Sequence, residues 1–227
     1  MELKNFVDLS NEQEKAFSKY MEMIIEWNKK INLTAITEKD EIIIKHFIDS
    51  ITLNKYINNN SSIIDIGTGA GFPGIPLKIY DESLDITLLD SLNKRIKFLD
   101  LVINELNLKN IKAIHGRAED LGQDNEYREK FDIVVSRAVA NLSTLLEYML
   151  PFCKVGGKCL IMKGPNIEQE IKNSKRALKE LGGKIETIDN FFLKGTDIER
   201  NIIIVEKMEK TKKQYPRKAG TPAKQPI

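Results

Sequence analysis

Three glycines at alternate positions follow a short apolar segment, in the run DIGTGAGFPG at residues 65–74. Gly67, Gly69 and Gly71 leave backbone without a Cβ, which is needed where a ligand touches the main chain or where φ is positive. A dinucleotide-binding fingerprint has its third glycine five residues after the first, where this chain has Phe72. The loop therefore favours a ligand with an adenosine and a charged amino-acid end but no phosphates, a description that fits S-adenosylmethionine (AdoMet).

Acidic residues close the next two apolar segments. Asp90 ends the run ITLLD, 25 residues after Asp65, about where such folds place a carboxylate that accepts ribose hydroxyls. The run HGRAED sets Ala118 and Glu119 at the end of a third segment, where a small residue and polar backbone can meet an adenine. The alternatives are a helix N-cap or surface charge for Asp90 and plain solvation for Glu119.

Basic residues close the fourth and fifth apolar segments. The fourth ends in SRAVA, residues 136–140, and its Arg137 has planar donors suited to a carboxylate or a phosphate. The alternative for Arg137 is an ion pair with Asp65 or Glu119. Lys163 ends the fifth segment in the same way.

A parallel sheet would bring these segment ends to one edge, where open α/β folds bind ligands. Apolar strands and helical intervals alternate five times, and two further strands follow with only a short loop between them, so they can form a hairpin. This pattern predicts an α/β fold with a doubly wound, mostly parallel seven-stranded sheet of the AdoMet-dependent methyltransferase type. The predicted strands are 62–66, 85–89, 111–114, 131–135, 158–162, 184–193 and 200–207, and the predicted helices are 74–80, 93–106, 141–150 and 167–181.

A helical extension is expected before the sheet. Ser10 and Gln13 can form a capping box, and a second helix is predicted from about Asp40 to Tyr56. His46 and Asp49 on that helix either line the site entrance or are satisfied core residues. Apolar residues three and four apart predict one buried stripe on the first helix: Phe17, Tyr20, Ile24, Trp27 and Ile31.

The polar run NNNSS marks the boundary of the extension, which divides the chain into residues 1–58, a methyltransferase domain at 59–207 and a tail at 208–227. The formal net charge of the 227 residues is +2. Seven basic and two acidic side chains between residues 206 and 227 give that end +5, which leaves −3 for the rest. A basic tail attracts a polyanion, although a tail that only aids solubility has the same composition.

Several classes of protein are disfavoured by composition. No segment has the roughly 18 consecutive apolar residues of a membrane span, and the first residues lack the apolar run of a signal peptide. Cys153 and Cys159 fit neither a zinc spacing nor a disulfide framework, so no metal is expected. A cytoplasmic monomer that does not bind membranes is the expectation.

The chain resembles the ribosomal RNA small-subunit methyltransferase G family over nearly its whole length. The extended GAGFPGIPL and the terminal YPRKAGTP are specific to this family, whereas the bare glycine loop is shared by many methyltransferases. The matching pieces are WNKKINLTAI (27–36), HFIDS (46–50), DIGTGAGFPGIPL (65–77), LLDSLNKRIKFL (88–99), GRAED (116–120), SRAVA (136–140), MKG (162–164) and YPRKAGTPAKQPI (215–227).

The resemblance implies AdoMet-dependent methylation of the N7 atom of one guanine in the 530 loop of 16S ribosomal RNA, guanine 527 in the family's rRNA numbering, within the small ribosomal subunit. The predicted cofactor positions, from the family and from the motifs above, are Gly67, Gly69, Phe72, Asp90, Ala118, Glu119 and Arg137. The predicted RNA contacts are Arg117, Arg137, Lys163, Arg200, Arg217 and Lys218.

No catalytic residue is assigned, because guanine N7 carries a lone pair and no proton, so its attack on a methyl group needs no general base. Two alternatives stay open. One is an assembly factor that binds RNA and retains AdoMet without turnover, and the other is a methyltransferase that acts on a small molecule.

Overall fold

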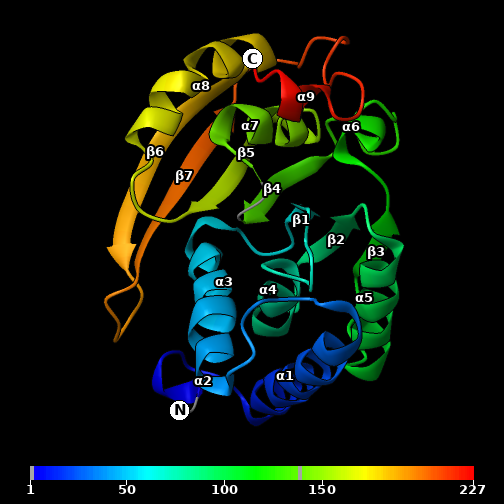
Figure 1. The fold of residues 1–227 in the computed structure, drawn as a ribbon, viewed down its shortest axis with the longest axis vertical. Helices are drawn as coiled ribbons and strands as arrows, with labels where there is room; N and C mark the ends of the chain where they lie inside the picture. Colours follow the sequence, from blue (N-terminus) through cyan, green and yellow to red (C-terminus); the bar gives the residue numbers. More distant parts are fainter. Residues whose placement is uncertain (1–2, 138–139) are drawn as a thin grey trace.

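The computed structural model describes residues 3–137 and 140–227, and its centre is a seven-stranded sheet in the order β3-β2-β1-β4-β5-β7-β6 (Figure 1). The strands β1 to β5 are parallel to one another, and β7 runs antiparallel to both β5 and β6. The predicted sheet and its terminal hairpin are confirmed. The strands are β1 Ser62–Ile66, β2 Asp85–Asp90, β3 Ile111–His115, β4 Phe131–Arg137, β5 Cys153–Lys163, β6 Gly183–Phe192 and β7 Glu199–Lys207.

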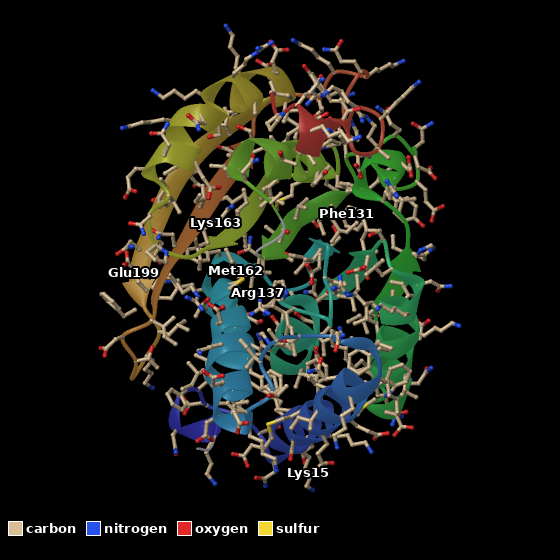
Figure 2. The ribbon with its side chains drawn as sticks, viewed as in Figure 1. Lys15, Phe131, Arg137, Met162, Lys163 and Glu199 are labelled. Carbon is tan, nitrogen blue, oxygen red and sulfur yellow. The ribbon has the colours of Figure 1, made fainter. Side chains whose placement is uncertain are left out.

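The strand order reverses between β1 and β4, and open α/β sheets bind ligands at such a reversal. Arg137 pairs with Met162 where β4 and β5 end, and both lie at the middle of the molecule with Lys163 (Figure 2). The carboxyl ends of the central strands therefore meet at one edge, as the sequence predicted.

Helices cover both faces of the sheet, which explains why its inner strands are almost continuously apolar. In β1, Ile63 belongs to the core on the side of α4 and α5, and Ile64 belongs to the core on the side of α7 and α8. The helices that follow the strands are α4 Gly74–Tyr80, α5 Asn93–Glu105, α6 Ala118–Leu121, α7 Leu142–Met149, α8 Glu168–Leu181 and α9 Thr221–Lys224.

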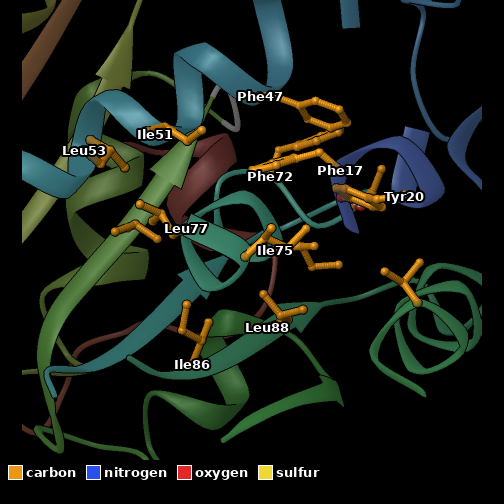
Figure 3. Packing of buried hydrophobic residues seen from close by; sticks show 14 of the residues in the cluster. Phe17, Tyr20, Phe47, Ile51, Leu53, Phe72, Ile75, Leu77, Ile86 and Leu88 are labelled. Carbon is orange, nitrogen blue, oxygen red and sulfur yellow. Dashed lines mark hydrogen bonds between the residues drawn. The ribbon is translucent and has the colours of Figure 1, made fainter. Parts of the chain in front are cut away.

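The helical extension shares a core with the sheet. Helix α1, Asn11–Ile31, begins with the predicted capping box, in which Ser10 and Gln13 satisfy each other's main-chain N–H groups. Of the predicted stripe, Phe17, Tyr20 and Ile24 are fully buried. Figure 3 shows Phe17 and Tyr20 packed with Phe47 and with Phe72 of the glycine loop. The boundary at residue 58 therefore does not separate two cores.

The second predicted helix runs from Lys39 to Tyr56 with changes of pitch. It comprises α2 (Lys39–Ile42), a π-helical turn (Ile43–Ile48), α3 (Asp49–Ile51) and a 3₁₀ turn (Thr52–Tyr56). Turns of π-helix often occur at functional sites because they redirect side chains. Apolar spacing does not reveal such a turn.

The C-terminal segment has little regular secondary structure, with the short helix α9 near its end. It returns across α7 (Figure 1). Tyr215 is buried in the core on the α7 side. In the part of the chain that is described, no helix is both long and apolar enough to cross a membrane.

Candidate functional site

The glycine loop follows β1 and turns back into α4. Gly67, Gly69 and Gly71 have φ values of 71°, 64° and 103°. A Cβ at Gly71 would lie 2.5 Å from Ile75 and 2.8 Å from the Tyr20 hydroxyl, so a side chain there would force these buried groups to shift. A Cβ at Gly69 would meet nothing within 4 Å, which means that this residue presents bare backbone to open space.

Asp65 holds the glycine loop by hydrogen bonds to both of its ends. Its Oδ2 accepts hydrogen bonds from Thr68 Oγ1 at 2.6 Å and from the Gly74 N–H at 2.9 Å. Its Oδ1 is buried without a hydrogen-bond partner among the described residues. Burial raises the pKa of Asp65 to about 7, against the opposing effect of these two donors.

Asp90 ties the loop to β2. Its Oδ2 accepts from the Gly69 N–H at 2.9 Å and from Arg95 at 3.1 Å, and its Oδ1 accepts from the Leu92 N–H at 2.9 Å. A carboxylate offers about four lone pairs, so about one is left. Accepting both hydroxyls of a ribose therefore requires one of these three donors to release its bond.

A first pocket of about 290 Å³ opens between the ends of β1, β2 and β3. Ala118 and Glu119 line it, as predicted for an adenine. Tyr148 of α7 and Gly220 of the C-terminal segment also line it, and neither was predicted. The remaining lining residues are Ile66, Gly67, Leu89, Asp90, Ser91, Gly116 and Arg117.

A second pocket of about 400 Å³ lies on the other side of the glycine loop. It shares Gly67, Asp90 and Ser91 with the first pocket, so the two pockets are adjacent along the loop. Its remaining lining residues are Leu33, Thr34, His46, Thr68, Gly69, Ala70, Phe72, Arg95 and Arg137.

His46 lies in the wall of the second pocket, and it is also buried among core side chains, so both readings of this residue hold. Its ring stacks on Phe72 with centroids 4.3 Å apart. His46 Nδ1 lies 3.0 Å from both Arg137 Nη2 and the Lys45 carbonyl oxygen, and Nε2 lies 2.8 Å from Thr34 Oγ1. Arg137 can only donate, so its contact requires Nδ1 to accept and places the ring proton on Nε2. Burial and the Arg137 charge lower the pKa of His46 to about 3, so the imidazole is neutral at physiological pH.

Arg137 turns its donors toward the helical extension. It donates to the Lys45 carbonyl at 2.9 Å and to His46 Nδ1, and its ion pair is with Asp49 at 3.4 Å. The predicted alternative pairing with Asp65 or Glu119 is therefore wrong.

Asp49 is 2% exposed and also accepts from Arg200 at 3.0 Å, so one buried carboxylate from the extension holds arginines of β4 and β7. Burial raises the pKa of Asp49, while the two arginines oppose that rise.

The predicted RNA contacts are in different environments. Arg117 and Lys218 are exposed, and Arg117 also lines the first pocket. Lys163 donates to Glu170 and to the Ala140 carbonyl, and Arg217 forms a bidentate pair with Glu147. Lys163 and Arg217 are therefore held by protein partners, and only their remaining N–H groups are left for a phosphate.

Two further predictions concern the SRAVA motif and metal binding. In the SRAVA motif, Ala138 and Val139 lie outside the described residues. Across the residues that the structure describes, no three His, Cys, Asp or Glu side chains are grouped to hold a metal ion.

Comparison with known proteins gives consistent matches. The sequence model of the family described as rRNA small subunit methyltransferase G matches residues 13–203. The ribosomal RNA small subunit methyltransferase G of Clostridium tetani is 56% identical over 93% of this chain and 90% of its own length. The protein of the same name from Acetivibrio thermocellus is 54% identical over 97% of this chain and 91% of its own length.

Solved structures with a similar fold are much more distant in sequence. M. jannaschii TYW2 in complex with AdoMet is 19% identical, with a TM-score of 0.53 over 69% of this chain and 74% of that one. A TehB-like SAM-dependent methyltransferase from Corynebacterium glutamicum is 14% identical, with a TM-score of 0.53 over 84% of this chain and 98% of that one. At these identities the likeness establishes the fold alone.

Proposed function

The chain belongs to the rRNA small subunit methyltransferase G family, and from that premise we propose that it transfers a methyl group from AdoMet to N7 of a guanine in the 530 loop of 16S ribosomal RNA. The family match and the relatives' names support methylation of small-subunit rRNA, and the choice of N7 and of this loop is the finer part of the proposal. The reaction takes place in the cytoplasm, on the small ribosomal subunit.

The residues of the two pockets fit AdoMet. The bare backbone at Gly69 leaves space that a Cβ would occupy, and two adjacent pockets along the loop suit a long ligand without phosphates. Ala118 and Glu119 would hold the adenine end, and Asp90 the ribose. The loop main chain at Gly67 and Gly69 would hold the amino-acid end, beside Phe72. When bound, AdoMet supplies a methyl group that its sulfonium sulfur has already activated.

The second pocket carries the residues that would hold the guanine. Unpaired RNA bases are commonly stacked on aromatic or guanidinium planes. His46, Phe72 and Arg137 are stacked planes at this pocket, with Arg137 4.8 Å from the centre of the Phe72 ring.

Orientation is the main contribution that these residues make. With a pKa lowered to about 3, His46 is a poor proton acceptor, and no general base is needed for N7, whose lone pair lies in the ring plane. Holding the two reacting atoms in line can account for about 7–11 kcal/mol of the barrier.

Methylation of isolated subunits tests the proposal. Small subunits from cells that lack this protein are incubated with the enzyme and methyl-labelled AdoMet, and aniline cleavage then maps N7-methylguanine. We expect label and cleavage at one guanine of the 530 loop. Label elsewhere, or no label with folded enzyme, contradicts the proposal.

A pocket-filling variant, Gly69→Trp, separates this enzyme from an assembly factor that retains AdoMet without turnover. Because a side chain at Gly69 projects into open space, the variant should fold in spite of the strain at its positive φ, and it should lose methylation. In cells it should leave 530-loop guanine unmethylated while subunit assembly proceeds. A subunit assembly defect in cells that lack the protein, rescued by this variant, would instead favour the assembly role.

A further inference from the structure

The C-terminal segment, residues 211–227, is packed against the methyltransferase domain beside the first pocket. Side chains of that domain donate hydrogen bonds to its main-chain carbonyls, so its path is held along its length. The donor and acceptor pairs are Arg128 to Thr211 and Tyr215 (2.7 Å each), Gln123 to Pro216 (2.8 Å) and Thr144 to Pro222 (3.0 Å).

Arg217 is the strongest anchor of this segment. Its guanidinium donates to both oxygens of Glu147, at 2.9 and 2.7 Å, and its main-chain N–H donates to the same carboxylate at 2.8 Å. Glu147 is completely buried on α7. Separating the pair would leave a buried charge without a partner, which is strongly unfavourable.

Gly220 connects this anchor to the pocket. Its N–H donates to Glu119 Oε1 at 2.9 Å, and it lines the first pocket together with Glu119 and Tyr148. Tyr148 is the next residue after Glu147, the partner of Arg217. On the C-terminal segment, Arg217 is three residues before Gly220 of the pocket wall. On α7, its partner Glu147 directly precedes Tyr148 of the same wall.

We propose that the C-terminal segment is part of the methyl-donor site, and that Arg217 is a positioning residue that fixes Gly220, and through it Glu119, at the adenine end of the pocket. The identity of the ligand rests on the proposed function. The segment then acts on cofactor affinity directly, in addition to any contact with RNA.

Coupling between the two ligands follows from the position of Lys218. Its exposed side chain lies between Arg217 and Gly220 in sequence. An RNA phosphate bound there would hold the same segment that closes the donor pocket. Because such coupling is reciprocal, small subunits should tighten cofactor binding by the factor by which the cofactor tightens subunit binding.

Hydrogen exchange on the wild-type protein is the first test. S-adenosylhomocysteine (AdoHcy), the demethylated product of AdoMet, should slow exchange of the main-chain amides of residues 217–225 as well as those of the glycine loop. Slowed exchange in the glycine loop with unchanged exchange in residues 217–225 would overturn the proposal.

Calorimetry on variants is the second test, with AdoHcy and with 5′-methylthioadenosine, which lacks the amino-acid end. Arg217→Met should raise the dissociation constants of both ligands by the same factor, on the order of tenfold. Arg217→Lys should restore part of the affinity, because it keeps the charge but not the bidentate geometry. Lys224→Met, which removes the same charge from an exposed side chain of the same segment, should leave both constants unchanged.

The results of these experiments distinguish failure of this proposal from failure of the proposed function. Wild-type affinity of a folded Arg217→Met protein contradicts the proposal. If that variant does not fold, Gln123→Ala decides, because Gln123 is exposed and donates to the carbonyls of Lys213 and Pro216. Unchanged affinity in that variant also overturns it. Failure of the wild-type protein to bind AdoHcy at all would contradict the proposed function instead.

Discussion

The guanidinium carbon of Arg137 lies 4.8 Å from the centre of the Phe72 ring, so a strand end and the glycine loop meet at one cation–π contact. Such contacts contribute about 0.5–2 kcal/mol, more when they are shielded from water. Arg137→Lys keeps the charge but loses the plane and most of the donors. We expect AdoHcy to bind roughly tenfold more weakly by calorimetry. The exposed Arg117→Lys, changed in the same way, should have a smaller effect; equal effects would contradict a special role for Arg137.

Asp49 is expected to support both arginines that it binds. Asp49→Asn keeps the size of the side chain but removes the charge between Arg137 and Arg200. Breaking a buried pair from one side costs about 3–5 kcal/mol, so urea unfolding should show a loss of this order. The partly exposed pair of Lys55 with Asp189 provides the matched control, and Asp189→Asn should cost less than about 1 kcal/mol. Similar losses for the two variants would count against the role of Asp49.

Substitutions at Gly69 and at Gly71 should have different effects on stability and on AdoHcy binding. Gly71→Ala meets Ile75 and Tyr20 at a positive φ, so it should lower the free energy of unfolding by about 2–4 kcal/mol. Gly69→Ala has space for its Cβ, so its cost in stability should be about 1–2 kcal/mol from its positive φ. It should instead weaken AdoHcy binding, because the methyl group enters the pocket. Thermal unfolding and calorimetry on both variants measure the two effects, and the reverse pattern would refute the assignment.

Asp65 should make stability depend on pH. Its folded pKa of about 7 lies above the unfolded value near 3.8, so the folded state keeps the proton to higher pH. The free energy of unfolding therefore falls as pH rises from about 4 to about 7, by up to about 4 kcal/mol for this group. Asp65→Asn should remove that component, which urea unfolding at pH 5 and pH 8 can measure. The exposed Asp100→Asn should leave the pH dependence as in wild type; an unchanged slope in Asp65→Asn would contradict the raised pKa.

Lys218 and Lys163 should differ in RNA binding. Lys218 is exposed, whereas Lys163 is paired with Glu170. Replacing a lysine that contacts a phosphate reduces the salt dependence of binding by about one counterion. Lys218→Met should therefore lower the slope of log affinity for small subunits against log salt by about 1, and Lys163→Met should change it less. Equal slopes for Lys218→Met and wild type would exclude Lys218 as a phosphate contact.

Local pattern determined most of the architecture. Strand and helix alternation, the capping box of Ser10 and Gln13, and the glycine loop all depend on neighbours within a few residues, so the sequence alone indicated them. The shared edge for Asp90, Glu119 and Arg137 followed from the parallel sheet. The resemblance to the family added the expected chemistry.

Only the tertiary structure decided which charged groups pair and which face ligand. Arg200 and Asp49 are 151 residues apart in the chain, and Arg217 and Glu147 are 70 apart. Composition marked the C-terminal segment only as a basic tail, whereas the buried Glu147 requires a cation and Arg217 of this segment supplies it. The side chain that satisfies a buried charge is set by packing between distant segments, and no local pattern in a single sequence encodes that choice.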